Sequence, residues 1–248
     1  MNPDNFVADP DAVAARLRAR VGEATKHLEQ TAAKLTDDQA LAPSLLPGWS
    51  RGHVLTHLAR NADGLRNLLV WARTGAETPQ YPSIQARNEA IEAGADRPAA
   101  ALAADVTESA ARFAAEADLL SGADWTAPVA GVRGYGHPAW YTLWRRLSEV
   151  QIHHVDLGLE YGPRDWPAQF AAQCLDRVAG DFAGPQCPPA VLRPTDDDSE
   201  YRIGPPAEPA TVTVTGTACD LLAWLIGRSP GDSLVTEPAG PLPPVPPW

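Results

Sequence analysis

The chain has 248 residues, of which 44% are hydrophobic and 21% are charged, values typical of a globular protein rather than a disordered one. Its formal net charge of −11 argues against a nucleic-acid partner, because phosphate binding requires clustered Lys and Arg. No stretch approaches the roughly 18 apolar residues of a membrane helix, and the first residues lack the basic and apolar regions of a signal peptide. We therefore expect a cytoplasmic protein with no membrane partner.

Helical periodicity dominates the first two thirds of the chain. Apolar residues at helical spacing, or Ala-rich composition, predict helices over 10–35, 51–74, 83–93, 99–120 and 139–160. Ser50 is the expected N-cap of the second helix, and Gly75 its end. A loop rich in Gly and Pro precedes the last of the five. Four long helices joined by loops indicate an α-helical bundle, which we assign to residues 1–163.

The pattern changes after Pro167, where short β-type runs alternate with helical segments. The predicted elements are helices over 167–183 and 217–228 and strands over 190–193, 211–215 and 233–236. Such a mixture predicts a smaller α+β domain over residues 164–248. The Pro-rich end of the chain is expected to lie extended on the surface.

The three cysteines, Cys174, Cys187 and Cys219, are widely spaced. An odd number in a reducing compartment favours free thiols over disulfides. None of the three lies in a recognisable nucleophile motif. If this protein uses thiol chemistry, the thiol comes from another molecule.

Three residues suggest a metal site. Glu149 and His153 are four positions apart on one predicted helix, so their side chains point from the same face. His57 lies on the predicted helix 51–74, whose apolar face is expected to meet the bundle interior. Two imidazoles and one carboxylate on facing helices would leave a tetrahedral zinc with one open position, the pattern of a catalytic site.

Spacing alone leaves other interpretations open. A Glu and a His four residues apart are more often a solvated pair than ligands. His53 is four residues before His57 and offers a rival pair on the second helix, whereas His154 lies about 100° around its helix from His153 and is expected to face elsewhere. Asp156 is either exposed or a hydrogen-bond acceptor for His153.

Several sequence runs together resemble one protein family. They are PGWSRGHVLTHLARNADGLRNLLVWARTGAETPQY (47–81), QARNE (85–89), LWRR (143–146), EVQIHHVDLG (149–158) and AWLIGR (223–228). The chain resembles the mycothiol-dependent maleylpyruvate isomerases over nearly its whole length. The resemblance implies a DinB-like four-helix bundle with a smaller C-terminal α+β domain. It also implies zinc bound by His57, Glu149 and His153, with His57 rather than His53 as the first ligand.

The reaction implied by this resemblance is cis–trans isomerisation of maleylpyruvate to fumarylpyruvate, a step of gentisate degradation. A thiolate adds to the conjugated double bond, the resulting single bond rotates, and elimination returns the thiol. The implied cofactors are zinc and mycothiol, and the partners are a small dicarboxylate substrate and this low-molecular-weight thiol. The resemblance further implies that Arg87 and Arg228 bind substrate carboxylates.

Both arginines also have plain structural interpretations. Arg87 is placed to pair with Glu89 or Glu92 on the surface, and Arg228 would be a cation favoured by a helix C-terminus. Two alternatives to the isomerase remain: a mycothiol S-transferase on the same scaffold, and a protein that binds a metal or small molecule without catalysis. Two histidines and a carboxylate also suit iron, nickel or manganese. Residues that hold the thiol are not assigned, and the oligomeric state is not predicted.

Overall fold

A computed structural model describes residues 9–132 and 134–248 of the chain. The described residues form two compact units, and the division falls between Leu159 and Glu160. The two units are described separately below. None of the described helices is both long and apolar enough to cross a membrane.

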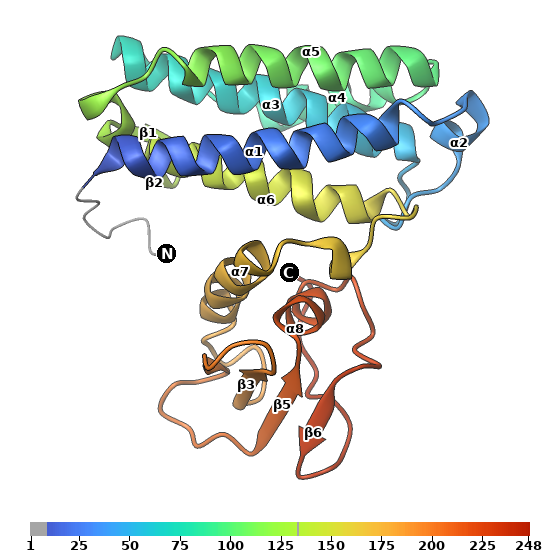
Figure 1. Cartoon of the computed structure of the whole chain (residues 1–248), viewed down its shortest axis with the longest axis vertical. Coiled ribbons are helices and arrows are strands. Elements are labelled where there is room, and N and C mark those ends of the chain that lie inside the picture. The colour runs from blue at the N-terminus through green and yellow to red at the C-terminus, as the bar shows by residue number, and fades with distance from the viewer. Residues whose placement is uncertain (1–8, 133) are drawn as a thin grey trace. The chain divides into compact units, whose positions relative to one another are not determined.

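The N-terminal unit is a four-helix bundle, as predicted (Figure 1). Its long helices are α1 (Pro10–Ala32), α3 (Arg51–Thr74), α5 (Ala99–Ala117) and α6 (Trp140–Asp156). They pack in a closed ring, in which α1 contacts α5 and α6, and α3 contacts the same two helices from the other side. The apolar stripes predicted from the sequence meet in the middle of this ring; for example, Leu28, Leu58 and Leu143 have no exposed surface.

Local signals fix the ends of the helices. The Ser50 hydroxyl accepts a hydrogen bond from the backbone N–H of His53, and Gly75 ends α3 with a φ of 71°, so both predicted boundaries are confirmed. Helix α6, predicted to run to residue 160, ends at Asp156. Gly158 follows with a φ of 64°, a left-handed conformation that a helix does not continue through.

Short elements complete the N-terminal unit. They are α2 (Asp37–Leu41), α4 (Ile84–Ala95), the 3₁₀ turn η1 (Gly122–Thr126), and strands β1 (Pro128–Ala130) and β2 (Gly136–Pro138). Helix α4 confirms the short helix predicted over 83–93. The expected Gly- and Pro-rich loop instead contains the antiparallel β1–β2 pair, in which Val129 pairs with His137. Helix α2 was not predicted, and a capping box of Thr36 with Gln39 begins it.

Helix α4 packs very closely on α3 because glycines lie at the contact. A Cβ atom added at Gly52 would lie 2.0 Å from the carbonyl oxygen of Ala95. One added at Gly94 would lie 2.5 Å from the Thr56 side chain. On the segment that leads into α4, one added at Gly64 would lie 2.8 Å from the Tyr81 ring. These distances leave no room for a side chain. The short distance between α3 and α4 therefore depends on glycines, which have no side chain.

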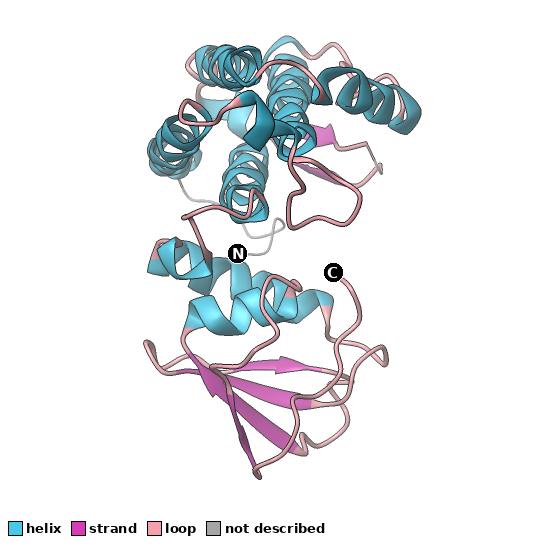
Figure 2. Cartoon of the chain, turned by 90° about the vertical axis from the view of Figure 1, so that its right-hand side faces the viewer, coloured by secondary structure: helices cyan, strands magenta, loops and turns pink. Residues whose placement is uncertain are grey.

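The C-terminal unit is a small α+β fold, as predicted. Its elements are η2 (Pro163–Asp165), α7 (Ala168–Asp181), β3 (Ala190–Pro194), β4 (Tyr201–Ile203), β5 (Val212–Gly216), α8 (Ala218–Leu225) and β6 (Val235–Glu237). The sheet order is β4-β3-β5-β6, with β3 and β5 parallel and both edge strands antiparallel to their neighbours. Figure 2 shows the two helices on one face of this sheet. Strand β4 was not predicted. The three cysteines are free, as expected.

Candidate metal centre

Side chains from α3 and α6 meet at one point inside the N-terminal unit. The Nε2 atom of His57 lies 2.9 Å from Oε2 of Glu149, and Nε2 of His153 lies 3.4 Å from the same oxygen. The two imidazole rings are nearly perpendicular, with centroids 4.6 Å apart. One nitrogen from each histidine and one oxygen from Glu149 all lie within 4.8 Å of one another. The three residues predicted as ligands are thus close enough to share one ion.

Asp156 orients one of these imidazoles. Its Oδ2 atom lies 2.7 Å from Nδ1 of His153, and its side chain is 1% exposed. The carboxylate accepts a hydrogen bond from the Nδ1–H group of His153, and this contact directs Nε2 toward the centre. A carboxylate behind a histidine ligand is a common support for metal sites. The hydrogen bond suggested by the three-residue spacing is confirmed.

The protonation states of the three side chains depend on one another. Burial alone would raise the pKa of Glu149, but hydrogen bonds from His153 and His57 hold it well below the usual range. Burial would lower the pKa of His153, but its hydrogen bonds to Asp156 and Glu149 raise it to about 9. For His57, burial is the largest effect and the pKa is lowered. The carboxylate is therefore ionised, and a proton is held on His153.

The donor set fits a zinc ion. Zinc takes imidazole nitrogens and carboxylate oxygens at about 2.0–2.2 Å, which places tetrahedral ligands roughly 3.3 Å apart. The two nitrogen–oxygen separations in the structure, 2.9 and 3.4 Å, are close to that spacing. Three protein donors leave one position for an external ligand. An ion bound here would displace the second proton of the His153 ring.

The neighbouring histidines have other partners. His53, the rival ligand, has its Nδ1 atom 2.7 Å from the Ser50 hydroxyl and its Nε2 atom 3.3 Å from Glu92. It belongs to the N-terminal cap of α3. His154 faces α1, where its Nε2 atom lies 2.7 Å from the Thr31 hydroxyl. Neither belongs to the group of three potential ligands.

Arg87 lies beside the centre. Its Nη2 group donates to Nδ1 of His57 at 3.0 Å, and its Nη1 group donates to the side chain of Asn88 at 2.9 Å. The surface pairing with Glu89 or Glu92 considered from the sequence is not formed among the described residues. Helix α4 brings Arg87 to this position because it packs so closely on α3.

A cavity of about 620 Å³ adjoins the centre, a volume within the usual range for small-molecule sites. Its lining includes His57, Glu149 and Arg87 together with Asn61, Gln80, Tyr81, Ile84, Asn88, Gly131, Val132, Tyr135, His137, Tyr141 and Arg145. Polar and aromatic groups therefore surround the space next to the potential ligands.

Arg145 contributes a second cation to this cavity. Its Nη2 group donates to Gln80 at 3.0 Å, and its Nη1 group lies 3.2 Å from Nε2 of His137. Burial lowers the pKa of His137 to about 4, so its ring is neutral and accepts from Arg145. Neither Arg145 nor Arg87 has a carboxylate at ion-pair distance among the described residues. Both guanidinium charges are available to an anionic ligand.

Arg228 belongs to the C-terminal unit. It was expected to end the helix predicted over 217–228, but α8 ends at Leu225. Gly227, with a φ of 71°, turns the chain beforehand. The Arg228 guanidinium donates to the carbonyl of Ile226 at 2.6 Å.

Sequence reasoning missed Arg145, Asn61 and Tyr81. Arg145 could have been found, because it lies four residues before Glu149 and hence on the same face of one helix. Asn61 is likewise four residues after His57. Tyr81 lies in the irregular segment before α4, where no periodic pattern indicates the direction of a side chain.

Comparisons with known proteins agree over nearly the whole chain. Residues 21–158 match the family model described as "Mycothiol maleylpyruvate isomerase N-terminal domain", and residues 165–247 match the one described as "MDMPI C-terminal domain". The crystal structure of the mycothiol-dependent maleylpyruvate isomerase is similar, with 29% identity and a TM-score of 0.86, covering 95% of this chain and 97% of that one. A histidine-to-alanine mutant of that isomerase gives the same identity and coverage, with a TM-score of 0.85. No match was found among curated proteins.

Proposed function

The chain belongs to the mycothiol maleylpyruvate isomerase family, and we propose that it catalyses the mycothiol-dependent cis–trans isomerisation of maleylpyruvate to fumarylpyruvate. The observation that carries the proposal is the group of His57, Glu149 and His153. It adjoins a cavity lined by two arginines that have no carboxylate partner among the described residues. We assign zinc to the three donors and the substrate to the cavity.

The three ligands and Asp156 define the environment of the metal. Bound zinc would lower the pKa of a coordinated thiol and so supply a nucleophile at neutral pH. Glu149 supplies one negative charge, and Asp156 keeps Nε2 of His153 directed at the ion. Because Cys174, Cys187 and Cys219 all have raised thiol pKa values through burial, the chain's own thiols are poor nucleophiles. This agrees with a reaction that uses an external thiol.

Arg87 binds one carboxylate of the substrate. An arginine only donates hydrogen bonds, so in the metal-free protein His57 must accept from Arg87 at Nδ1 and carry its proton on Nε2. A metal at Nε2 requires the proton on Nδ1, where it would face the Arg87 donors. A zinc ion at Nε2 would therefore weaken the contact between Arg87 and His57 and leave the Arg87 guanidinium to the substrate carboxylate.

Arg145 binds the second carboxylate. It lines the same cavity, its present partners are the neutral Gln80 and His137, and a dianion offers it a charged partner instead. The family resemblance gives a similar task to Arg228, and we retain it as a third candidate. Arg87→Met, Arg145→Met and Arg228→Met should each raise KM for the dicarboxylate. A variant whose KM and kcat both equal those of the wild type would show that the replaced arginine does not bind the substrate.

The decisive experiment is an isomerisation assay on purified protein of measured zinc content, with and without catalytic mycothiol. The proposal requires turnover that depends on both zinc and thiol, with the thiol recovered unchanged. Stoichiometric consumption of mycothiol would identify a transferase instead. Absence of turnover with a full metal site would refute the isomerase assignment.

Ligand assignment is tested by metal content. His57→Ala, Glu149→Ala and His153→Ala should each lose bound zinc and activity. His53→Ala is the matched control on α3 and should retain zinc, because His53 contacts the helix cap and Glu92 rather than the centre. Loss of zinc from the control, or its retention in the other three, would show that the ligand set is wrong.

A further inference from the structure

A second cavity, of about 550 Å³, lies between α1 and α5 in the same unit. It is lined mainly by small or apolar side chains, among them Ala15, Ala19, Val21, Ala110, Ala111, Phe113, Ala114, Ala117 and Leu143. Its size is within the range of small-molecule sites, about 300–1,000 Å³. Alanines at the facing positions of the two helices keep the space open. We call this cavity the α1–α5 groove.

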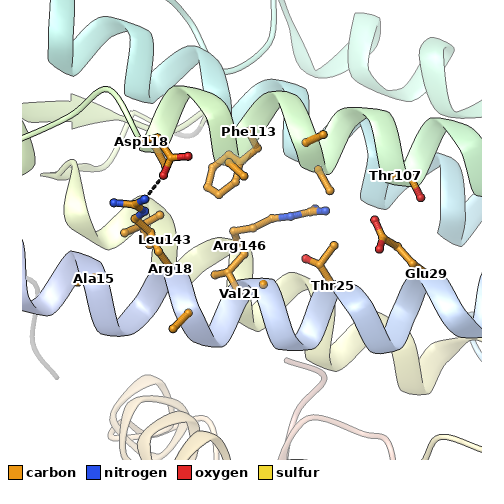
Figure 3. Close-up of a pocket in the computed structure, with 16 residues that line it drawn as sticks. Ala15, Arg18, Val21, Thr25, Glu29, Thr107, Phe113, Asp118, Leu143 and Arg146 are labelled. Atoms are coloured by element: carbon orange, nitrogen blue, oxygen red, sulfur yellow. Dashed lines mark hydrogen bonds and ion pairs between the residues drawn. The ribbon is translucent and has the colours of Figure 1, made fainter.

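Arg146 lies at the floor of the α1–α5 groove. Figure 3 shows its side chain extending from α6 into the space between α1 and α5, toward Thr25. The residue has no exposed surface. Its Nη1 group donates to the carbonyl of Leu58 at 2.7 Å and to Oδ1 of Asn61 at 3.0 Å. These two acceptors use only one of the three guanidinium nitrogens.

The other two nitrogens of Arg146, Nε and Nη2, are buried and have no hydrogen-bond partner among the described residues. A buried donor without a partner costs free energy, more so when it carries charge. Burial also lowers the Arg146 pKa to about 10, although nearby acids, Glu149 first, oppose that shift. A charged group held in this way lacks a counter-ion.

The charged residues that line the groove do not supply one. Arg18 forms its own ion pair with Asp118, visible in Figure 3. Glu29 lines the groove but makes no ion pair with Arg146 among the described residues. Within the described part of the chain, no carboxylate therefore makes direct contact with the Arg146 guanidinium.

We propose that the α1–α5 groove binds a monocarboxylate with an apolar body, and that Arg146 pairs with its carboxylate. The free Nε and Nη2 groups lie along one edge of the planar guanidinium, and two parallel donors match the two oxygens of a carboxylate. The single guanidinium charge of Arg146 matches a ligand with one carboxylate, and the apolar lining matches an alkyl or aryl body. Because Arg146 is fully buried, the side chains above it shift when the ligand enters.

This site is distinct from the zinc centre. Arg145 and Arg146 are consecutive on α6, so they point about 100° apart around the helix, the first to the metal-side cavity and the second to the groove. Asn61 connects the two, because it lines the metal-side cavity and accepts from Arg146. The inference needs neither zinc nor isomerase activity.

The test is calorimetric binding of octanoate to the full-length zinc-loaded protein, with octan-1-ol as the uncharged probe of equal length. We expect one octanoate per chain and binding of octan-1-ol weaker by about tenfold or more, since charged hydrogen bonds contribute most of the difference. A chemical-shift change of the Arg146 Nε–H on addition of octanoate locates the contact. No octanoate binding, or equal binding of the alcohol, would overturn the proposal.

Variants separate the groove from nonspecific binding. Arg146→Met should weaken octanoate binding about tenfold or more. If this variant does not fold, Ala114→Phe provides the test, because it fills the groove from an exposed position of α5 and leaves the Arg146 side chain in the protein. Its matched control is Ala115→Phe, an exposed neighbour that does not line the groove. Equal octanoate affinity in these two phenylalanine variants would refute the site, as would a liganded crystal structure showing water alone at Nε and Nη2.

Discussion

Zinc binding should compete with a proton at His153. The hydrogen bonds to Asp156 and Glu149 raise the pKa of His153 to about 9 in the metal-free protein, whereas zinc requires its Nε2 atom without a proton. Burial lowers the pKa of His57, and the pKa of Glu149 is well below its usual range, so these two side chains release no proton near neutral pH. Well below pH 9, each pH unit should weaken zinc binding about tenfold. Because about half of the His153 side chains already carry the proton at pH 9, the affinity at pH 7 should be about 50-fold lower than at pH 9.

The assay is competition for zinc with a chromophoric chelator between pH 6.5 and 9, corrected for the chelator's own protonation. Calorimetry at pH 7.5 in buffers of different ionisation enthalpy should detect the release of about one proton per zinc bound. An affinity that does not change with pH, with no proton released, would show that His153 carries no extra proton in the metal-free protein.

Asp156→Asn provides a matched test of the cause. The amide oxygen can accept the same hydrogen bond from Nδ1 of His153 and keep the ring oriented, but the negative charge is lost. The pKa of His153 should fall, and fewer protons should be released on zinc binding at pH 8. Unchanged proton release in this variant would show that Asp156 does not set the pKa.

Three further predictions concern stability and are checked by urea unfolding. Because the pKa of His153 is raised from 6.5 to about 9, its protonation stabilises the metal-free fold, and this stabilisation is complete below pH 6.5. The contribution should be lost as pH rises to about 9. Zinc-loaded protein should not show this loss. Gly52→Ala should lower the free energy of unfolding by about 1–3 kcal/mol, because its Cβ would meet the Ala95 carbonyl. Gly22→Ala, in the middle of α1 with no atom near its Cβ, should raise it by about 0.5–1 kcal/mol, and equal effects would contradict the packing argument. Ser50→Ala should cost about 1 kcal/mol through loss of the α3 cap, and no change would mean that the cap is dispensable.

The sequence predicts the long helices well because apolar residues recur along them at a single period. It does not predict α2, the β1–β2 pair or β4, since each has five or fewer residues, too few to show a clear apolar period. The end of α6 was also placed too late. The Gly162-Pro163 pair predicts a helix end at residue 160, whereas the left-handed conformation of Gly158 ends the helix earlier.

Within the site, helical spacing predicts that Glu149 and His153 share a face, but it does not show that His57 rather than His53 lies opposite. The family resemblance made that choice, and the contacts of His53 with Ser50 and Glu92 explain it physically. The carboxylate of Asp156 was foreseen as one of two options. The cavity could not be foreseen, because the segment around Tyr135 reaches it through the β1–β2 pair.

The close contact of α3 and α4 bears on how enzymes of this family could diverge in substrate preference. Arg87 reaches the centre because Gly52 and Gly94 allow its helix to approach. A relative with alanine at one of these positions would hold that helix farther out and admit a longer dicarboxylate, with every residue that touches the substrate unchanged. Substrate specificity in such enzymes would then depend on the distance between two helices. A comparison restricted to pocket residues would not detect this difference.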